Sequence, residues 1–259
     1  MNFDPRITPA RSDLAAAHLR GKVQAGQFVE GTEQEVIVGI ASVRNGPSHG
    51  ATQVTEALRG ERVTIYETDD EGWAWGQLAS DKYVGWLPSA ALLAPAAAPT
   101  HKVTALRTFE FPGPSIKLPP MDALPLGAQV AVAGEQESFA VLTSGGYVPK
   151  THLAALSAHE TDFVVVAERF AGTPYLWGGK SSLGIDCSGL VQVALTACGI
   201  ACPRDSDMQE AALGKPVSLA GLQAGDLIFW KGHVAIARSR NSMIHANAFH
   251  MAVTTEPVG

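Results

Sequence analysis

The sequence has no apolar run long enough to cross a membrane and no cluster of basic residues. A membrane-spanning helix needs about 20 consecutive apolar residues, and no stretch of these 259 residues comes close. The net charge is −6, and Lys and Arg never gather into a run. Because a protein that binds nucleic acid needs a basic face, we expect neither a nucleic-acid nor a membrane partner. The expected partner is a small polar molecule or a peptide, and the sequence does not give the oligomeric state.

The N-terminus also lacks the pattern of a secretory signal. Such a signal has an apolar core of about 7–15 residues after a basic start. Charged residues interrupt any such core at Asp4, Arg6, Arg11, Asp13 and Arg20. We therefore expect a cytoplasmic protein.

Cysteine is scarce as well, since the chain has only Cys187, Cys198 and Cys202. An odd count fits a reducing compartment better than a disulfide framework. No C-x-x-C pair points to zinc. The cysteine chemistry considered below requires no metal or organic cofactor, and none is expected. Cys198 and Cys202 are expected to have structural roles, because Cys198 falls on an apolar helix stripe and Cys202 lies in a loop before a proline.

Short β-type runs dominate the first 156 residues. Residues 12–20, SDLAAAHLR, predict a short helix capped by Ser12, within an N-terminal helical extension of residues 1–29. Residues 30–95 and 101–156 each predict a small barrel, because turn residues punctuate short runs such as RVTIYET, GWAWGQLA and FAVLTS. The parallel between DKYVGWLPSAALL and SGGYVPKTHLAAL indicates an internal repeat. Both stretches resemble the closing strand and turn of bacterial SH3-like barrels.

The remaining residues, 157–259, have the order of an α+β domain, with helices first and strands after. HETDFVVVAERFAG predicts a helix that Gly172 ends, and CSGLVQVALTACG predicts a helix from Cys187 to Cys198 closed by Gly199. GDLIFW, HVAIAR and SMIHANAF then predict strands of an antiparallel sheet.

Cys187 could be an apolar filler, half of a disulfide, a metal ligand or a nucleophile. A thiol at a helix N-terminus faces unpaired N–H groups and the positive end of the helix dipole, which lowers its pKa. Gly178, Gly179 and Gly184 before it would allow a tight approach. Gly189 weakens a helix by about 1 kcal/mol, and a bare backbone there would let a substrate lie close. Free cysteines are nevertheless often buried fillers.

A nucleophilic thiol needs a base and a group that orients the base. His233 opens one predicted strand, and His245 lies in the next. Their numbers differ by an even amount, so an odd-length loop of three or five residues would place both on one face of a hairpin. Asn247 passes the same test, whereas His250 does not. A helix-capping thiol together with two parity-matched imidazoles favours catalysis.

Four motifs in this order resemble the NlpC/p60 family of papain-like cysteine peptidases: TPYLWGGKSSLGIDCSGLVQ, PRDSDMQ, GDLIFWKGHVAIA and MIHANA. The likeness covers about residues 158–250. With the SH3-like units before it, the chain is similar to bacterial γ-D-glutamyl-L-diamino acid endopeptidases. The resemblance implies an α+β, papain-like catalytic domain preceded by two SH3-like barrels. It also implies that Cys187 is the nucleophile, His233 the base and His245 the polar third member. Asn247 is then not expected to be the third member.

The resemblance further implies substrate-binding residues. Tyr175 corresponds to a tyrosine beside the thiol that helps the oxyanion, and Trp177 to a pocket wall. Asp186 and Ser188 correspond to groups that hold the free amine and backbone of the substrate's L-Ala. Ser206 corresponds to another pocket residue, and Tyr83 to a tyrosine by which the first barrel covers the site. Arg204 and Asp205 are expected to brace their loop.

One departure concerns the amine clamp. Relatives that require a free amine carry an acid in the first barrel, and its place here falls on Val54, with Glu56 nearby. The barrel's part in amine binding is therefore in doubt, whereas Asp186 could still supply a carboxylate.

These observations predict an enzyme that recycles murein by cleaving free muropeptides of the L-Ala-γ-D-Glu-diaminopimelate type. Three alternatives stay open. The same chemistry could act on intact wall after export by another route. The barrels could instead make the chain a wall-binding protein with an idle peptidase domain, or the thiol could transfer acyl groups to an amine.

Overall fold

The computed structural model describes residues 3–259, so residues 1 and 2 of the expected N-terminal extension lie outside the described part. The chain forms two compact units. One holds the described residues up to 101 together with 109–124 and 128–150, and the other holds 102–108, 125–127 and 151–259. Strands of the expected second barrel thus contribute to both units. Each unit is described by itself below.

The N-terminal segment contains strands where a helix was predicted. Strand β1 (Leu14–Ala16) pairs in parallel with β2 (Gln27–Val29), and only a single 3-10 turn, η1 (Ala17–Leu19), follows β1. Ala16 occupies the cap position without a side-chain hydrogen bond, so the predicted Ser12 cap is wrong. Leu14, Ala15 and Ala16 are all buried. Strand pairing and burial here override the helix preference of an alanine-rich run.

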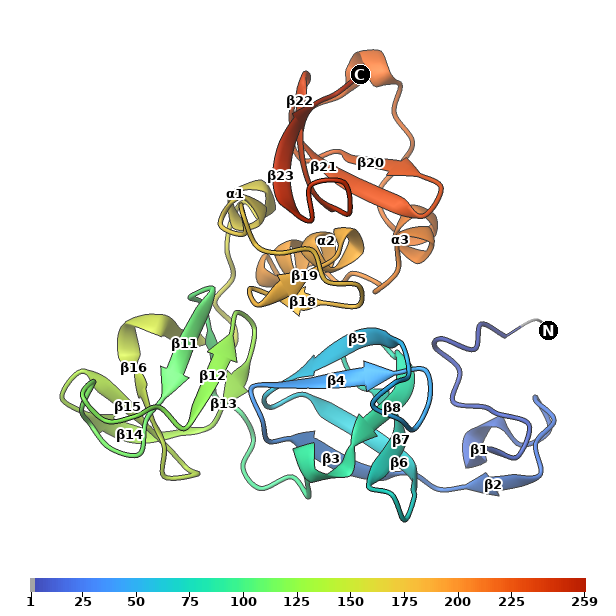
Figure 1. The fold of residues 1–259 in the computed structure, drawn as a ribbon, viewed down its shortest axis with the longest axis vertical. Coiled ribbons are helices and arrows are strands. Elements are labelled where there is room, and N and C mark those ends of the chain that lie inside the picture. Colours follow the sequence, from blue (N-terminus) through green and yellow to red (C-terminus); the bar gives the residue numbers. More distant parts are fainter. Residues whose placement is uncertain (1–2) are drawn as a thin grey trace. The chain divides into compact units, whose positions relative to one another are not determined.

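The first predicted barrel is a seven-stranded sheet of order β5-β4-β8-β7-β6-β3-β9 (Figure 1, blue to teal). Its strands are β3 (Thr32–Val36), β4 (Ile40–Arg44), β5 (Gln53–Leu58), β6 (Arg62–Thr68), β7 (Trp73–Leu78), β8 (Val84–Pro88) and β9 (Leu92–Leu93). Val36, Val43, Val63 and Leu87 are fully buried in its core. The predicted run RVTIYET is β6, and GWAWGQLA contains β7.

The predicted internal repeat is present in the structure. After β8 the chain makes a 3-10 turn, η2 (Ser89–Ala91), and then enters β9. The second copy runs from β16 (Tyr147–Pro149) through η3 (Lys150–His152) to β17 (Leu153–Ala155). The other strands of this region are β10 (His101–Val103), β11 (Arg107–Glu110), β12 (Asp122–Pro125), β13 (Gln129–Val130), β14 (Val132–Gln136) and β15 (Phe139–Leu142). β14, β15 and β16 form an antiparallel sheet.

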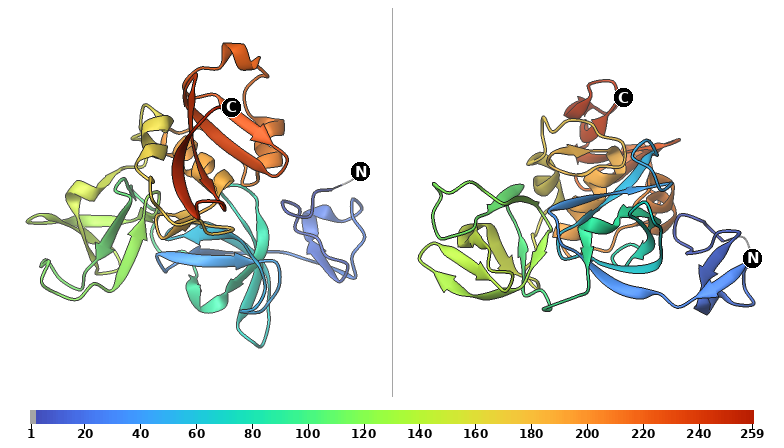
Figure 2. Two further views of the ribbon diagram at one scale, coloured as in Figure 1. Left: turned by 45° about the horizontal axis from the view of Figure 1, so that its top comes forward. Right: turned by 60° about the horizontal axis from the view of Figure 1, so that its bottom comes forward.

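The C-terminal region is the predicted α+β domain (Figures 1 and 2, yellow to red). It contains the helices α1 (Phe163–Glu168), α2 (Cys187–Ala197) and α3 (Ser206–Ala212), the short hairpin β18 (Lys180–Ser181) and β19 (Gly184–Ile185), the turn η4 (Leu219–Gly221), and the strands β20 (Leu227–Trp230), β21 (His233–Ser239), β22 (Ser242–Asn247) and β23 (Ala252–Pro257). The last four strands form one antiparallel sheet in chain order. Among residues 3–259, no helix combines the length and apolar character that crossing a membrane requires.

Helix α2 is the central element of this domain. It packs against β21, β22 and α1, and its Leu190, Val191 and Ala194 are fully buried in the core. α1 is shorter than predicted, because regular helix ends at Glu168 and the chain turns before Gly172 (φ +80°). The N-terminus of α2 lies beside the start of β21, where the Val234 N–H contacts Cys187.

Candidate active site

The helix that carries Cys187 begins at that residue, as predicted. Asp186 is the N-cap in an extended conformation, and its Oδ1 accepts a hydrogen bond of 2.7 Å from the Gly189 N–H. Such a cap satisfies one of the donors that the first turn of a helix leaves unpaired. The Cys187 side chain is thereby held at the first turn and is buried.

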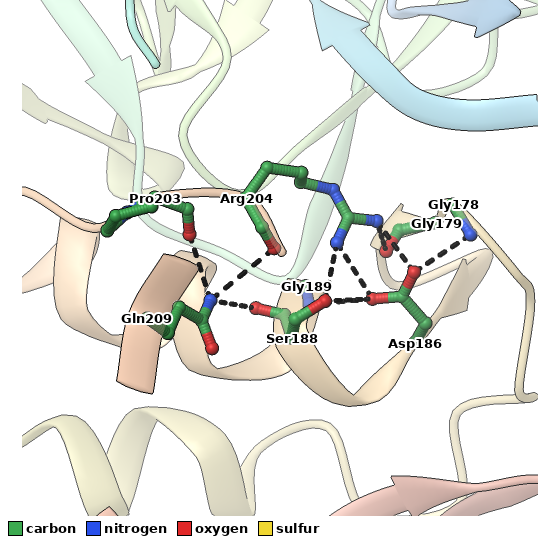
Figure 3. Close-up of polar contacts among 8 residues, drawn as sticks. All are labelled: Gly178, Gly179, Asp186, Ser188, Gly189, Pro203, Arg204 and Gln209. Atoms are coloured by element: carbon green, nitrogen blue, oxygen red, sulfur yellow. Dashed lines mark hydrogen bonds and ion pairs between the residues drawn. The ribbon is translucent and has the colours of Figure 1, made fainter. Parts of the chain in front are cut away.

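Arg204 binds the same carboxylate. Its guanidinium donates to Asp186 Oδ1 at 2.9 Å and Oδ2 at 2.7 Å, and to the carbonyl oxygen of Gly179 at 3.2 Å (Figure 3). The Gly178 N–H donates to Oδ2 at 2.8 Å. Arg204 is 1% exposed, so this is a buried, two-pronged ion pair. Arg204 was expected to brace its own loop, whereas its guanidinium contacts Asp186, Ser188 and Gly179 around the start of α2.

Ser188 and Gln209 extend the network. The Ser188 hydroxyl donates to Asp186 Oδ1 at 3.2 Å and accepts from Arg204 at 2.9 Å. The Gln209 amide, from α3, donates to the carbonyl oxygens of Ser188 and Pro203 (Figure 3). Five donors therefore surround the Asp186 carboxylate, which offers about four lone-pair directions. The structure shows Asp186 and Ser188 as scaffold residues, and their contact with a substrate stays a prediction.

Gly189 does not offer a bare surface to a substrate, so that expectation is wrong. A Cβ atom at this position would lie 2.3 Å from the carbonyl oxygen of Gly179. The glycine is required because the loop before Cys187 packs directly on the helix backbone.

The pKa of the Cys187 thiol departs from its ordinary value in the direction opposite to the expected one. Burial, followed by the charge of Asp186, raises the pKa of the thiol. Hydrogen bonds to the sulfur from the N–H groups of Val234 and Ser188, together with the Arg204 charge, oppose this rise. The helix N-terminus therefore acts in the predicted direction, but desolvation outweighs it. The Val234 contact places the sulfur beside the residue that follows His233.

His233 and His245 meet as predicted. His233 Nε2 lies 2.8 Å from His245 Nδ1, and the two rings are edge to face at 5.0 Å. The predicted odd-length loop is wrong, because only Arg240 and Asn241 separate β21 from β22. A register shift between Ala237 and Ser239 supplies the extra residue instead.

Burial and the neighbouring His245 lower the pKa of His233. Trp230, paired with His233 across the β20–β21 ladder, lies with its ring 5.6 Å from the imidazole and contributes to this environment. A raised thiol pKa and a lowered imidazole pKa together favour a neutral Cys187–His233 pair in the free protein.

Tyr175 and Trp177 both lie on the loop before Cys187, and Tyr175 is close enough to the thiol to feel its charge. Burial and the charges of Cys187 and Asp186 raise the pKa of Tyr175 to about 12, so its hydroxyl stays protonated at neutral pH. Trp177 follows two residues later and is 63% exposed. Ser206 is the first residue of α3. Tyr83 belongs to the other unit, where it is buried in the barrel core, and its role at the site stays a prediction.

Sequence reasoning missed Glu256. Its Oε2 lies 2.5 Å from His245 Nε2, on the opposite side of that ring from His233. Glu256 lies two residues after Thr254, the direct partner of His245 in the β22–β23 ladder. A fourth strand predicted over TTEP, with period-two alternation, would have placed this carboxylate on the face of the histidines.

Residues 172–258 match the NlpC/P60 family, and residues 43–92 match the bacterial dipeptidyl-peptidase SH3 domain. The C-terminal domain belongs to the NlpC/P60 family. Dipeptidyl-peptidase 6 of Lysinibacillus sphaericus is 40% identical over 90 residues, which is 35% of this chain and 33% of that protein. Gamma-D-glutamyl-L-lysine dipeptidyl-peptidase of Bacillus subtilis (strain 168) is 40% identical over 93 residues, which is 33% of this chain and 31% of that protein. The chain thus matches about a third of the length of these relatives.

The fold extends beyond the NlpC/P60 domain. A crystal structure of an NlpC/P60 family protein from Bacillus cereus ATCC 10987 superposes with a TM-score of 0.75, covering 87% of this chain and 94% of that one at 22% identity. Together with the two family matches, this similarity confirms the predicted α+β fold with an NlpC/P60 domain and an SH3 domain before it, and the second SH3-like barrel stays a prediction.

Proposed function

We propose that this protein is a cysteine endopeptidase that hydrolyses the γ-D-glutamyl–L-diamino acid bond of cell-wall muropeptides. The observation that carries the proposal is the arrangement around Cys187: a thiol at the first turn of α2, hydrogen-bonded by the Val234 N–H, with His233 and His245 joined at 2.8 Å. The name of one relative that is 40% identical over 93 residues, gamma-D-glutamyl-L-lysine dipeptidyl-peptidase, supports the γ-D-glutamyl bond class.

In the proposed reaction His233 is the general base. Its Nε2 is engaged by His245, which leaves Nδ1 to accept the proton of the Cys187 thiol as Sγ attacks the γ-carbonyl carbon of D-Glu. The C–N bond then breaks, and His233 returns the proton to the departing amine of the diamino acid. The resulting thioester is attacked by water, which His233 deprotonates, and the thiol is regenerated.

Charge develops on the carbonyl oxygen during the attack. The backbone N–H of Cys187 and the hydroxyl of Tyr175 are the proposed donors to this oxyanion. The Tyr175 hydroxyl can serve as a donor because it is protonated at neutral pH, as its pKa of about 12 requires. One such donor is worth about 3–4 kcal/mol of transition-state stabilisation.

The proposed substrates are free peptides with an N-terminal L-Ala, of the type L-Ala-γ-D-Glu-diaminopimelate, processed during murein recycling in the cytoplasm. The proposed contacts within the C-terminal unit are made by Tyr175, Trp177, Asp186, Ser188 and Ser206. A free substrate amine would contact Asp186 only by displacing one of its present donors, so recognition of the amine carries an energetic cost here.

Mass spectrometry of the products from a small substrate panel tests the proposal. The panel holds the free tripeptide, the tripeptide with an acetylated L-Ala amine, and purified sacculi. We expect L-Ala-D-Glu and free diaminopimelate from the tripeptide, and no cleavage of the acetylated form. Equal rates of cleavage with and without the acetyl group would show that the enzyme does not recognise the free L-Ala amine. Release of products from sacculi without activity on the tripeptide would favour hydrolysis of intact wall over murein recycling. The absence of products from every member of the panel would overturn the proposal.

A further inference from the structure

Glu256 terminates a row of side chains that begins at the base of the proposed reaction. His233, at the start of β21, contacts His245 in β22 through Nε2 and Nδ1 at 2.8 Å. The other nitrogen of His245, Nε2, lies 2.5 Å from Glu256 Oε2 in β23. Three adjacent strands of one sheet thus supply three groups in hydrogen-bond contact.

Hydrogen-bond chemistry gives this row a direction. An ionised carboxylate can only accept, so the 2.5 Å contact with Glu256 Oε2 requires a proton on His245 Nε2, although the Asn247 amide nitrogen, also a donor, lies 2.8 Å from the same ring atom. In a neutral imidazole the second nitrogen is then an acceptor, so His245 Nδ1 accepts from His233 Nε2–H. The remaining nitrogen of a neutral His233, Nδ1, therefore has a lone pair. This is the form that can take a proton from a thiol.

We infer that Glu256 is a positioning residue that fixes the tautomer of His233 through His245. The inference rests on the proposed function, because it gives His233 the part of general base. Glu256 does not touch the reacting atoms and acts only through the two imidazoles.

The surroundings of Glu256 hold its two oxygens in place. His250 Nε2 lies 3.1 Å from Oε1, and the Asn247 amide nitrogen lies 3.3 Å from Oε2 and 2.8 Å from His245 Nε2. The His250 N–H donates to Asn247 Oδ1 at 2.8 Å, which orients the amide with its nitrogen toward the carboxylate. Asn247, demoted as a third member of the site, is thereby a clamp on Glu256.

The charge of Glu256 is retained at neutral pH. Hydrogen bonds from His250 and His245, the two titratable groups that face it, lower the pKa of this carboxyl. The same charge acts on His233, whose imidazolium form it favours against the effects of burial and His245. Loss of the carboxylate should therefore change both the tautomer and the pKa of His233.

Glu256→Gln tests the inference, because the amide keeps the shape but can also donate to His245 and so permits the reversed chain. Glu168→Gln is the matched control: Glu168 is 39% exposed against 34% for Glu256, and it pairs with Arg238 rather than with an imidazole. We expect kcat on the tripeptide to fall about tenfold or more in Glu256→Gln, with KM nearly unchanged. The acid limb of the pH profile of kcat/KM should also move to lower pH, and Glu256→Asp should recover part of kcat. A Glu256→Gln profile that matches Glu168→Gln in both kcat and acid limb would overturn the inference.

A second readout is independent of turnover. Two-bond ¹H–¹⁵N correlations of histidine-labelled protein at about pH 8, where free imidazole is neutral, report which ring nitrogen is protonated. We expect His233 and His245 both to carry the proton on Nε2, and Glu256→Gln to mix the tautomers of His245. A proton on Nδ1 of either ring in the wild type overturns the inference. If both rings carry the proton on Nε2 but the protein cleaves no muropeptide, the proposed function is contradicted and the positioning role of Glu256 is not.

Discussion

The Arg204 guanidinium donates to both oxygens of the Asp186 carboxylate, directly before Cys187, and it does so while 1% exposed. This pair connects the loop before α3 to the first turn of α2. It fixes the position of the thiol through backbone geometry rather than by touching the sulfur.

Replacing Arg204 with Met should destabilise the protein by about 3–5 kcal/mol, because the Asp186 carboxylate would lose its buried partner. Urea unfolding of the two proteins measures the difference. Arg169→Met is the matched control, since it breaks the partly exposed Arg169–Glu160 pair, also at 2.7 Å, and should cost no more than about 1 kcal/mol. Equal losses in the two variants would contradict the structural role of Arg204.

Cys187 should be a slow nucleophile toward small alkylating reagents at neutral pH. Burial and Asp186 raise the pKa of the thiol, and only the thiolate reacts. In a Cys198→Ser/Cys202→Ser background, the rate of iodoacetamide labelling, followed by intact-mass spectrometry, should still rise as the pH passes 9.0, the ordinary value for cysteine. A rate that has already reached its plateau at neutral pH would show a stable thiolate–imidazolium pair instead.

Stability should decrease between about pH 7.5 and 5.5 because of His233. Burial and His245 lower its pKa below the ordinary 6.5. As the pH falls through 6.5, the unfolded chain therefore takes up a proton at this position before the folded protein does, and the free energy of unfolding declines. Urea midpoints at the two pH values should show a smaller decline in His233→Gln than in the wild type. The lowered pKa of Glu256 affects stability only below its ordinary value of 4.5, outside this pH window. Identical declines in the wild type and in His233→Gln would therefore contradict the environment assigned to His233.

Local patterns were sufficient to predict the parts of the site that lie within single elements. The apolar helical pattern of CSGLVQVALTACG predicted the start of α2 at Cys187, which the structure confirms. Period-two alternation predicted that His233 and His245 share a face. That parity is correct although the predicted loop length is wrong, because a bulge restores the register that the two-residue loop would otherwise have broken.

Long-range contacts could not be predicted in this way. Arg204 reaches Asp186 across 18 residues of chain, and nothing local to PRDSDMQ distinguishes a buried guanidinium from a loop brace. The balance between burial and the helix dipole at Cys187 likewise depends on neighbours that the fold brings together. The alanine-rich run at residues 12–20 was mistaken for a helix because its pairing partner, β2, lies beyond the local pattern.

The most direct measurement compares hydrolysis of the γ-D-Glu–diaminopimelate bond by Cys187→Ala and by Cys198→Ala, with circular dichroism and thermal melting as checks on the fold. Cys198 is also a free cysteine, at the C-terminal cap of the same helix. The account predicts that Cys187→Ala melts as a folded protein and releases no diaminopimelate, whereas Cys198→Ala keeps its turnover. Near-normal turnover by folded Cys187→Ala would contradict it.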